Sequence, residues 1–428
     1  MKNNIAQKNI PDGWQEKKLA DVCDIVNGST PKRTVSEYWE NGNIPWFTVD
    51  DIRSNGRIIN KTNQSITDKA LKGTSVKLLP EDSVLLCCTA SLGEVALAKI
   101  PLTTNQQFNG LVSKDKTNLF PYYLFYSAQK FGENLKSKSG KTTINFLSVG
   151  SLSEEKVLVP PIKEQQKIAE ILGAVDEDIE KTGQVIEKTE ELRRGLIQQL
   201  LTRGIGHTKF KETKIGQIPE GWRVASLQTM LDEGLIVSHL DGNHGELYPK
   251  SNEFVDTGVP YISANCIEDG NVNLKKAKYL SPERASKFIK GVALSGDVLF
   301  AHNATVGPVA ILDTEERNVI LSTTLTYYRC NENKLVPAYL RYFMESPLFS
   351  DQYKKVMAQT TRNQVPITMQ RTFLHVLPEY KEQKEIAEIL SAVDEKIWVN
   401  KKLKEKLTLL KKGLMQDLLS GKVRTLIN

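Results

Sequence analysis

The chain contains the same sequence twice, and this repeat restricts its possible folds more than any other feature. EQQKIAEILGAVDEDIE begins at Glu164 and EQKEIAEILSAVDEKIW at Glu382, while LRRGLIQQLL begins at Leu192 and LKKGLMQDLL at Leu410. Both pairs share one offset of 218 residues. IPDGW and IPEGW mark the start of each copy, at 10–14 and 218–222. Similarity of this length and order predicts two copies of one structural unit of about 200 residues.

Each copy opens with roughly 150 residues of short apolar runs separated by turn residues. These runs are rich in Val, Ile, Tyr and Phe, which is typical of strands; they span 43–52, 82–90 and 95–100, then 258–267, 296–304 and 306–313. A helix is predicted after them, over 121–135 in the first copy and 337–357 in the second. The order indicates a mixed α+β domain rather than regular βαβ alternation.

Each copy closes with one long helix of about 40 residues, or about 60 Å. Apolar or small residues recur in steps of four and three in both helices, which is the pattern of a coiled coil. They are Ile168, Leu172, Val175, Ile179, Thr182, Ile186 and Thr189, then Ile386, Leu390, Val393, Ile397, Asn400, Leu407 and Leu410. Prolines at 160–161 and 378 stand before the helices, and Gly204, Gly206 and Gly421 follow them.

The chain order predicts that the two helices pair antiparallel, with the globular domains at opposite ends and related by a pseudo-two-fold axis. The alternative is that each helix packs only on its own globular domain. Thr182 and Asn400 are polar seam positions that fix the register of the pair or, alternatively, face solvent.

The predicted fold class is therefore α+β, with two mixed α/β globular domains separated by two long antiparallel coiled-coil helices. The expected boundaries are 1–159 for the first domain and 160–204 for the first helix. The junction and second domain follow at 205–377, and the second helix at 378–428.

Composition narrows the class of protein. The net charge of +6 and pI of about 8.8 permit nucleic-acid binding without requiring it. Five cysteines without Cys-x-x-Cys spacing and five scattered histidines argue against a disulfide framework or a zinc site. The N-terminus is polar and no apolar run approaches 18 residues, so we expect a cytoplasmic protein with no membrane segment.

The repeated motifs, taken in order, resemble the specificity (S) subunit of type I restriction–modification enzymes. The motifs are the Ile-Pro-x-Gly-Trp pairs, a Gly-x-Thr-Pro loop at 28–31, TTNQQF at 103–108, a Pro-Pro-x-x-Glu-Gln helix start at 160–165 and the junction at 204–222. The resemblance covers nearly the whole chain. The second copy departs from it, because SHLDGNHGELYP stands where the Gly-x-Thr-Pro loop is expected.

This resemblance implies a recognition subunit without catalysis of its own. Each globular domain reads one half of a split site in double-stranded DNA, and the helices set the spacing and dock two methyltransferase (M) subunits. Two restriction/motor (R) subunits complete the enzyme. S-adenosylmethionine, ATP and Mg are used by those partners, and this chain binds no cofactor. Because the two globular domains differ strongly while the helices agree, the site is expected to be asymmetric.

Polar loops supply the candidate DNA contacts, because Arg, Lys, Asn and Gln read base edges and Ser, Thr and cations bind phosphates. In the first domain they are Thr30, Lys32, Arg33, Asn105, Gln106, Lys141, Thr142, Thr143 and Asn145. In the second they are His302, Asn303, Thr360, Thr361, Arg362, Asn363 and Gln364. The candidate helix–partner interface comprises Ile168, Leu172, Val175, Ile179, Ile386, Leu390, Val393 and Ile397. Helix cations such as Arg193, Arg194, Lys411 and Lys412 are expected to cover a solvated face or to meet the methyltransferase.

Catalytic motifs are weak by comparison. SGKTT at 139–143 lacks the first glycine of a phosphate loop, Leu135 standing in its place, and the second copy loses the Gly-Lys pair. No methyltransferase motif is recognisable, and the Pro-Asp…Glu-x-Lys pattern at 11–18 is too short for a nuclease and is not repeated. Two alternatives remain open: service to a combined methyltransferase–nuclease polypeptide, and a coiled-coil scaffold whose modules bind protein or sugar.

Overall fold

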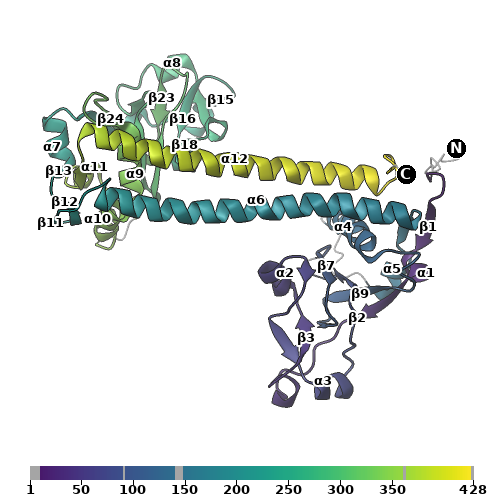
Figure 1. Ribbon diagram of the computed structural model, residues 1–428. Helices are drawn as coiled ribbons and strands as arrows, with labels where there is room; N and C mark the ends of the chain where they lie inside the picture. The colour runs from purple at the N-terminus through teal and green to yellow at the C-terminus, as the bar shows by residue number, and fades with distance from the viewer. Residues whose placement is uncertain (1–9, 90–91, 140–147, 360–362, 426–428) are drawn as a thin grey trace, which may run out of the picture. The chain divides into compact units, whose positions relative to one another are not determined.

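The computed structural model describes residues 10–89, 92–139, 148–359 and 363–425, and the chain divides into two compact units (Figure 1). Unit 1 comprises Met1–Gly183 and Lys402–Asn428, and unit 2 comprises Gln184–Lys401. Each unit therefore contains one globular domain and a segment of both long helices.

The globular part of unit 1 is built on two sheets and a short ladder. The larger sheet has the order β2-β9-β6-β7-β4, comprising Cys23–Asn27, Phe108–Ser113, Val84–Cys87, Val95–Ala98 and Ile58–Ile59. The smaller has the order β5-β3-β8, comprising Gln64–Ile66, Ile44–Phe47 and Thr103–Thr104. β1 (Gln15–Lys18) pairs antiparallel with β10 (Lys156–Val159), which brings the two ends of the domain together. The helices are α1 (Leu19–Val22), α2 (Val49–Asn55), α3 (Asp68–Gly73), α4 (Pro121–Ser139) and α5 (Val149–Ser153).

Unit 2 repeats this plan with additional strands. Its six-stranded sheet has the order β14-β24-β21-β22-β18-β17, comprising Ile236–Asp241, Leu325–Cys330, Val298–Asn303, Thr305–Ile311, Asn271–Val272 and Ile267–Glu268. Its five-stranded sheet has the order β15-β19-β16-β23-β20, comprising Phe254–Val255, Lys278–Leu280, Val259–Ile262, Val319–Leu321 and Val292–Ala293. β13 (Arg223–Ser226) pairs with β25 (Leu374–Leu377) as β1 pairs with β10, and β11 (Phe210–Thr213) with β12 (Gly216–Pro219) forms a hairpin. The helices are α7 (Leu227–Asp232), α8 (Pro282–Ala285), α9 (Pro337–Glu345), α10 (Pro347–Met357) and α11 (Ile367–Gln370).

The two long helices are α6 (Ile162–Arg203, 42 residues) and α12 (Tyr380–Leu418, 39 residues), as the heptad pattern predicts. Within unit 1 the first half of α6 packs with the last turns of α12, and within unit 2 the last half of α6 packs with the first turns of α12. The helices therefore run antiparallel where they meet inside each unit.

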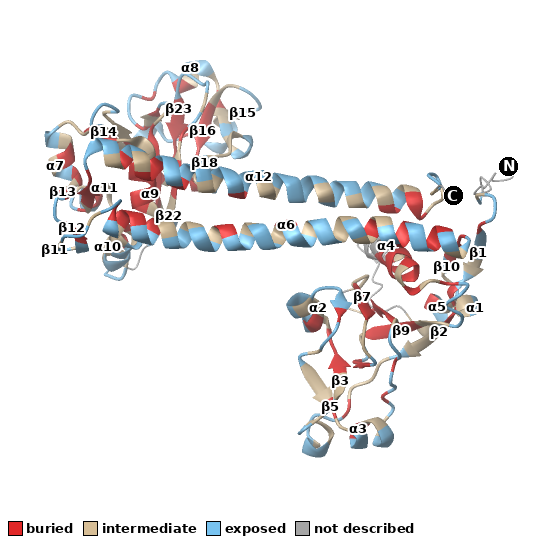
Figure 2. Ribbon diagram, viewed as in Figure 1, coloured by how far each residue is buried: buried red, intermediate tan, exposed pale blue. Residues whose placement is uncertain are grey.

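The coiled-coil prediction is confirmed where the helices pair inside each unit, and the alternative is wrong, because one end of each helix joins the core of the other copy's globular domain. Ile168 and Leu172 lie in one core with Met415 and Leu418, and Trp14 belongs to the same core. The second core joins other parts of the same two helices to its own domain, through Ile197, Leu200, Ile386, Leu390 and Trp222. Figure 2 shows the buried positions of α6 and α12 gathered near the globular domains, with exposed residues between them.

Three local predictions are wrong for identifiable reasons. The run 43–52 is a strand only as far as Phe47; Thr48 and Asp51 then cap α2, with the Thr48 amide donating to Asp51 Oδ2 at 2.7 Å. The helix predicted over 337–357 breaks into α9 and α10, because Pro347 starts a new helix after Ser346. Leu410 was assigned to the seam but is 51% exposed.

The structure also shows whether the two polar seam positions, Thr182 and Asn400, fix the register of the helix pair. Thr182 is buried, but its hydroxyl donates to Asp178 O at 2.6 Å within its own helix, and the Asn400 amide donates to Lys396 O in the same way. Neither hydrogen bond crosses the helix pair. Val175, Ile179 and Val393 are half-buried, and Ile397 is buried.

Candidate nucleic-acid interface

The Gly-x-Thr-Pro loop of the first domain is held against the end of β8 by its backbone. The Gly28 amide donates to Phe108 O at 3.0 Å, and the Ser29 amide donates to Thr104 O at 2.9 Å. A Cβ on Gly28 would lie 2.1 Å from Asn105 O, so no other residue fits this crossing. The loop is therefore a fixed platform for the polar side chains that follow it.

The structure brings four of the predicted contact residues to this platform. Thr30 donates to the exposed Gln106, and Lys32 and Arg33 are exposed on the same loop. The guanidinium of Arg33 lies 3.7 Å from the centre of the Trp39 ring.

The structure does not favour Asn105 as a DNA contact, because its side chain is 9% exposed and forms hydrogen bonds within its own turn. It accepts from the Gln107 amide at 3.0 Å and donates to Gln107 Oε1 at 3.0 Å. Its role is to shape the loop that presents Gln106.

The second domain has the same platform although its sequence lacks the motif. The Gly242 amide donates to Leu325 O at 3.1 Å, and a Cβ there would lie 2.2 Å from Ser322 O. Gly242 follows β14 as Gly28 follows β2, and β14 pairs with β24 as β2 pairs with β9. The two domains therefore share this backbone crossing, although different side chains follow it.

Two further predicted loops of the second domain meet each other. Asn303 and Gln364 form an antiparallel bridge, and the Ala304 amide donates to Asn363 O at 3.0 Å. The Asn303 amide group donates to Thr323 O at 3.4 Å, and that of Asn363 to Ala304 O at 2.5 Å. These side chains lie beside the end of β21, where exposed or half-exposed amides remain available.

His302 is the second predicted DNA contact that the structure does not favour, since its side chain is only 3% exposed. Burial lowers its pKa, although a hydrogen bond to Val365 O at 3.1 Å opposes this effect. A neutral, buried imidazole of this kind supports the loop and does not face a ligand. The remaining candidates, Lys141, Thr142, Thr143, Asn145, Thr360, Thr361 and Arg362, lie outside the described residues.

The repeated tryptophans and glutamates join each domain to its helix. Trp14 Nε1 donates to Glu164 Oε2 at 3.0 Å in unit 1, and Trp222 Nε1 donates to Glu382 Oε2 at 2.8 Å in unit 2. The second carboxylate oxygen meets a side chain from the chain segment that follows the other helix. It accepts from Arg424 Nε at 2.8 Å in unit 1, and it lies 2.9 Å from His207 Nε2 in unit 2. Burial would raise the pKa of Glu164, but the hydrogen bonds from Arg424 and Trp14 hold it below its ordinary value.

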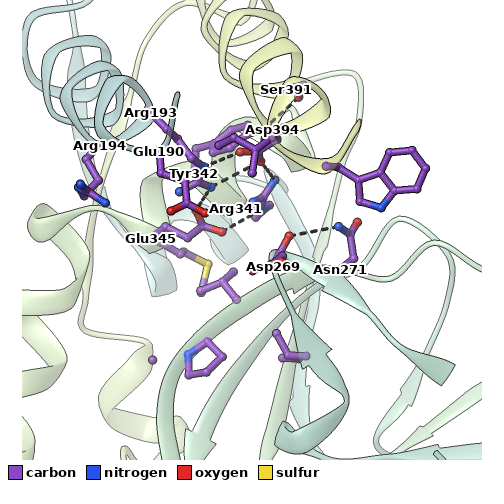
Figure 3. A pocket seen from close by; sticks show the side chains of 18 of the residues that line it. Glu190, Arg193, Arg194, Asp269, Asn271, Arg341, Tyr342, Glu345, Ser391 and Asp394 are labelled. Atoms are coloured by element: carbon purple, nitrogen blue, oxygen red, sulfur yellow. Dashed lines mark hydrogen bonds and ion pairs between the residues drawn. The ribbon is translucent and has the colours of Figure 1, made fainter. Parts of the chain in front are cut away.

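A second junction is an ion-pair cluster in unit 2, which we call the arginine node (Figure 3). Asp394 on α12 accepts from Arg193 on α6, and from Arg341 Nη1 and the Tyr342 hydroxyl on α9, both at 2.9 Å. Glu345 accepts from Arg193 at 2.6 Å and from Arg341 at 2.9 Å. The node ties both long helices to the recognition domain beside a cleft of about 990 Å³, and Arg194 and Trp398 also line this cleft.

Unit 1 has a smaller version of this node. Lys411 on α12 contacts Asp176 on α6 at 2.6 Å and Gln129 on α4 at 3.2 Å, and the Tyr126 hydroxyl donates to Asp176 at 3.0 Å. Lys411 and Asp176 stand 218 residues from Arg193 and Asp394, so the pair belongs to the repeat. The prediction that Arg193 and Lys411 cover a solvated face is therefore wrong. One signal was available, because both residues continue the four-and-three spacing of the seam.

Comparison with known proteins decides the family. A family model described as the type I restriction modification DNA specificity domain matches residues 11–190 and 237–409, which is most of the chain. The chain belongs to this family.

Individual specificity subunits agree with this assignment. The type I restriction enzyme MjaVIII specificity subunit of Methanocaldococcus jannaschii is 26% identical over 422 residues, covering 97% of this chain and 94% of that protein. The MjaIX specificity subunit of the same organism is 33% identical over 270 residues, 61% of this chain and 60% of its own. The crystal structure of the type I restriction–modification S subunit from M. genitalium matches with a TM-score of 0.60 at 16% identity, over 96% of this chain and 97% of that one. That similarity shows a shared fold.

As a type I specificity subunit, the chain is the non-catalytic DNA-recognition component of its system, and it works with DNA and with M and R subunits. The resemblance found in the sequence is therefore confirmed. In the described ranges, no three His, Cys, Asp or Glu side chains gather closely enough to hold a metal ion. No described helix combines the length and apolarity needed to cross a bilayer.

Proposed function

We propose that this specificity subunit reads a bipartite, asymmetric site in double-stranded DNA, with one half-site for each globular domain. In this proposal two adenine methyltransferase subunits and two motor-nuclease subunits assemble on it, and the paired helices set the number of base pairs between the half-sites. S-adenosylmethionine, ATP and Mg serve those partners, and the complex acts in the cytoplasm.

One observation carries the proposal: the two domains hold the same glycine platform but present different side chains on it. Gly28 and Gly242 make equivalent backbone crossings, whereas Thr30, Lys32 and Arg33 follow the first and Asn243 and His244 follow the second. Rigid backbone with variable polar side chains is what reading two unlike base sequences requires. Two identical readers would instead predict a palindromic site.

The contact set is narrower than the sequence suggested, because Asn105 and His302 are buried. We propose that the described DNA contacts are made by Thr30, Lys32, Arg33 and Gln106 in the first domain and by Asn303, Asn363 and Gln364 in the second. The candidates outside the described residues, Lys141, Thr142, Thr143, Asn145, Thr360, Thr361 and Arg362, stay part of the proposal.

The helices offer partner subunits a different surface from the predicted one. Ile168, Leu172, Ile386 and Leu390 are fully buried in the cores of their own units. Apolar side chains that remain exposed on the helices include Val185, Leu192, Tyr380, Ile389, Trp398 and Val399 in unit 2 and Leu403, Leu409 and Leu410 in unit 1. Exposed apolar positions of this kind favour protein contacts, and we propose that they meet the methyltransferase.

The test is selection from a randomised duplex pool by the subunit assembled with its methyltransferase. We expect one split motif with two unlike halves and a fixed spacer. Replacing the first globular domain by that of another specificity subunit should change one half only. Enrichment of a palindromic or continuous motif, or a change in both halves, would refute the two-reader proposal. Service to a combined methyltransferase–nuclease is not favoured, because the relatives are subunits of type I enzymes.

A further inference from the structure

The recognition domains share a second feature that their motifs do not reveal, which is a pair of aromatic side chains seven residues apart. In the first domain Trp39 and Trp46 lie with ring centres 5.0 Å apart and planes nearly perpendicular. In the second, Phe254 and Tyr261 lie 5.4 Å apart. The inner members, Trp46 and Tyr261, are buried, and each follows a proline.

The inner members of the two pairs occupy the same place in the fold. Trp46 lies on β3, which pairs antiparallel with β5 and parallel with β8. Tyr261 lies on β16, which pairs antiparallel with β19 and parallel with β23. The two sequences agree poorly here, so the position and geometry of the pair are what the two halves retain.

In each domain the aromatic pair carries one exposed cation. The Arg33 guanidinium lies 3.7 Å from the Trp39 centre and 4.7 Å from the Trp46 centre. The Lys278 ammonium lies 4.7 Å from the Phe254 centre. Arg33 comes from the glycine loop, whereas Lys278 comes from β19, directly opposite Tyr261. The two domains thus reach one arrangement with different cations from different elements.

Neither cation is engaged by a carboxylate. Among the described residues Arg33 and Lys278 form no ion pair, whereas Arg53 and Arg57 in the first domain pair with Asp50 and Glu94. A cation over an aromatic ring is attracted by the negative face of the ring and keeps its N–H donors free. The side chain is therefore ordered in advance, which reduces the entropy lost on binding.

The indoles of the first domain also hold the loop that carries the arginine. Trp39 Nε1 donates to Lys32 O at 3.2 Å, and Trp46 Nε1 donates to Ser29 O at 3.2 Å. Both hydrogen bonds fix the backbone between the Gly28 crossing and Arg33. The pair of tryptophans, Trp39 and Trp46, thus orients the loop and the guanidinium together.

We propose that Arg33 and Lys278 are the preorganised cationic DNA contacts of their domains, each held by its aromatic pair. This inference rests on the proposed function. The chemistry is donation to acceptor atoms of DNA: the planar guanidinium fork fits the paired acceptors of a phosphate or of a guanine edge, and the ammonium binds as a point charge.

The experiment compares variants of the full subunit, assembled with methyltransferase, on the selected duplex at several salt concentrations. Arg33→Ala and Lys278→Ala are the tests. Lys61→Ala and Arg317→Ala are the matched controls, each removing an exposed cation that has no ion pair in the described part of the same domain. We expect each test variant to bind roughly 5- to 150-fold more weakly and the controls to bind as wild type.

The same measurements show whether the acceptor atoms belong to a guanine or to a phosphate. A guanine contact relaxes the selected motif at one position, within the half-site of the mutated domain. A phosphate contact leaves the motif intact and lowers the slope of log affinity against log salt by about one. Arg33→Lys should restore much of a phosphate contact and little of a guanine contact.

Trp39→Leu keeps the cation and removes its support, so it should weaken binding in the same direction as Arg33→Ala. The inference is wrong if both alanine variants match their controls in affinity, motif and salt slope while the wild-type complex still selects a split motif. If the wild-type complex shows no sequence preference, both the proposed function and this inference are refuted.

Discussion

Substituting Asp394 by Asn should destabilise unit 2 much more than the repeat-equivalent Asp176→Asn destabilises unit 1. Asn keeps the volume of the side chain and one acceptor oxygen, so the change removes charge without opening a cavity. Asp394 neutralises two arginines, Arg193 and Arg341, whereas Asp176 has one cationic partner among the described residues, Lys411. The two substitutions therefore form a matched pair within one molecule.

The expected magnitudes follow from burial. The side chains of Arg341 and Arg193 are 9% and 21% exposed, and without Asp394 they share only the charge of Glu345. Removing one partner of a buried pair costs about 3–5 kcal/mol; because Glu345 remains and Asp394 is 24% exposed, we expect about 2–3 kcal/mol. Asp176 is 35% exposed and has one cationic partner, so its loss should cost about 1 kcal/mol after solvent screening.

The sign of the pH dependence follows from the pKa of Asp394. Burial would raise this pKa, but the hydrogen bond from Arg193 and the charges of Arg341 and Arg193 outweigh burial and hold it below the ordinary value. A lowered pKa in the folded state stabilises the protein above the unfolded pKa of about 4, and this contribution is lost as the pH falls further. The difference between wild type and Asp394→Asn should therefore shrink in acid.

The assay is hydrogen exchange measured by mass spectrometry, which reports each unit separately where a single global transition would not. Peptides covering α9 should lose protection in Asp394→Asn, and peptides covering 121–132 should lose less in Asp176→Asn. Equal losses in the two variants, or a cost below about 0.5 kcal/mol for Asp394→Asn, would refute the reasoning from burial.

Two further predictions concern the buried histidines of unit 2 and the Gly28 crossing of unit 1. All five histidines lie within unit 2, and burial lowers the pKa of His239 to about 3 and of His375 to about 4. Because these imidazoles stay neutral when folded, stability is lost as the pH falls below the unfolded value of about 6.5, by about 2 kcal/mol each at pH 5. Urea unfolding read by pulsed hydrogen exchange, which reports each unit separately, should show unit 2 weakening between pH 7 and 5 while unit 1 does not, and parallel losses would contradict this. Gly28→Ala should destabilise the first domain by about 1–3 kcal/mol and weaken selection of one half-site, because its Cβ meets Asn105 O. Gly150→Ala, whose Cβ meets only Ser148 Oγ at 3.8 Å, is the control, and an equal effect from both would refute the crowding argument.

The site was only partly predictable from the sequence. The Gly-x-Thr-Pro loop was found because it matches a motif of the family that the sequence resembles, and Thr30 does contact Gln106. Asn105 and His302 were misassigned because a polar side chain in a loop has the same sequence signal whether it faces solvent or supports the backbone. Gly242 was missed because its neighbours do not repeat the motif, although its backbone crossing does.

The sequence by itself determined the duplication, the α+β class, the two long helices and, to within two residues, the positions at which they begin. These features depend on local chemistry and periodicity, which a linear pattern records. Tertiary structure decided which half of each helix completes which core, that Arg193 and Lys411 bind aspartates across the helix pair, and that Arg33 and Lys278 occupy equivalent aromatic platforms. These outcomes depend on packing between segments distant in sequence: the same arginine or lysine is solvated beside water and paired beside a buried carboxylate, and only the fold determines which of these surrounds it.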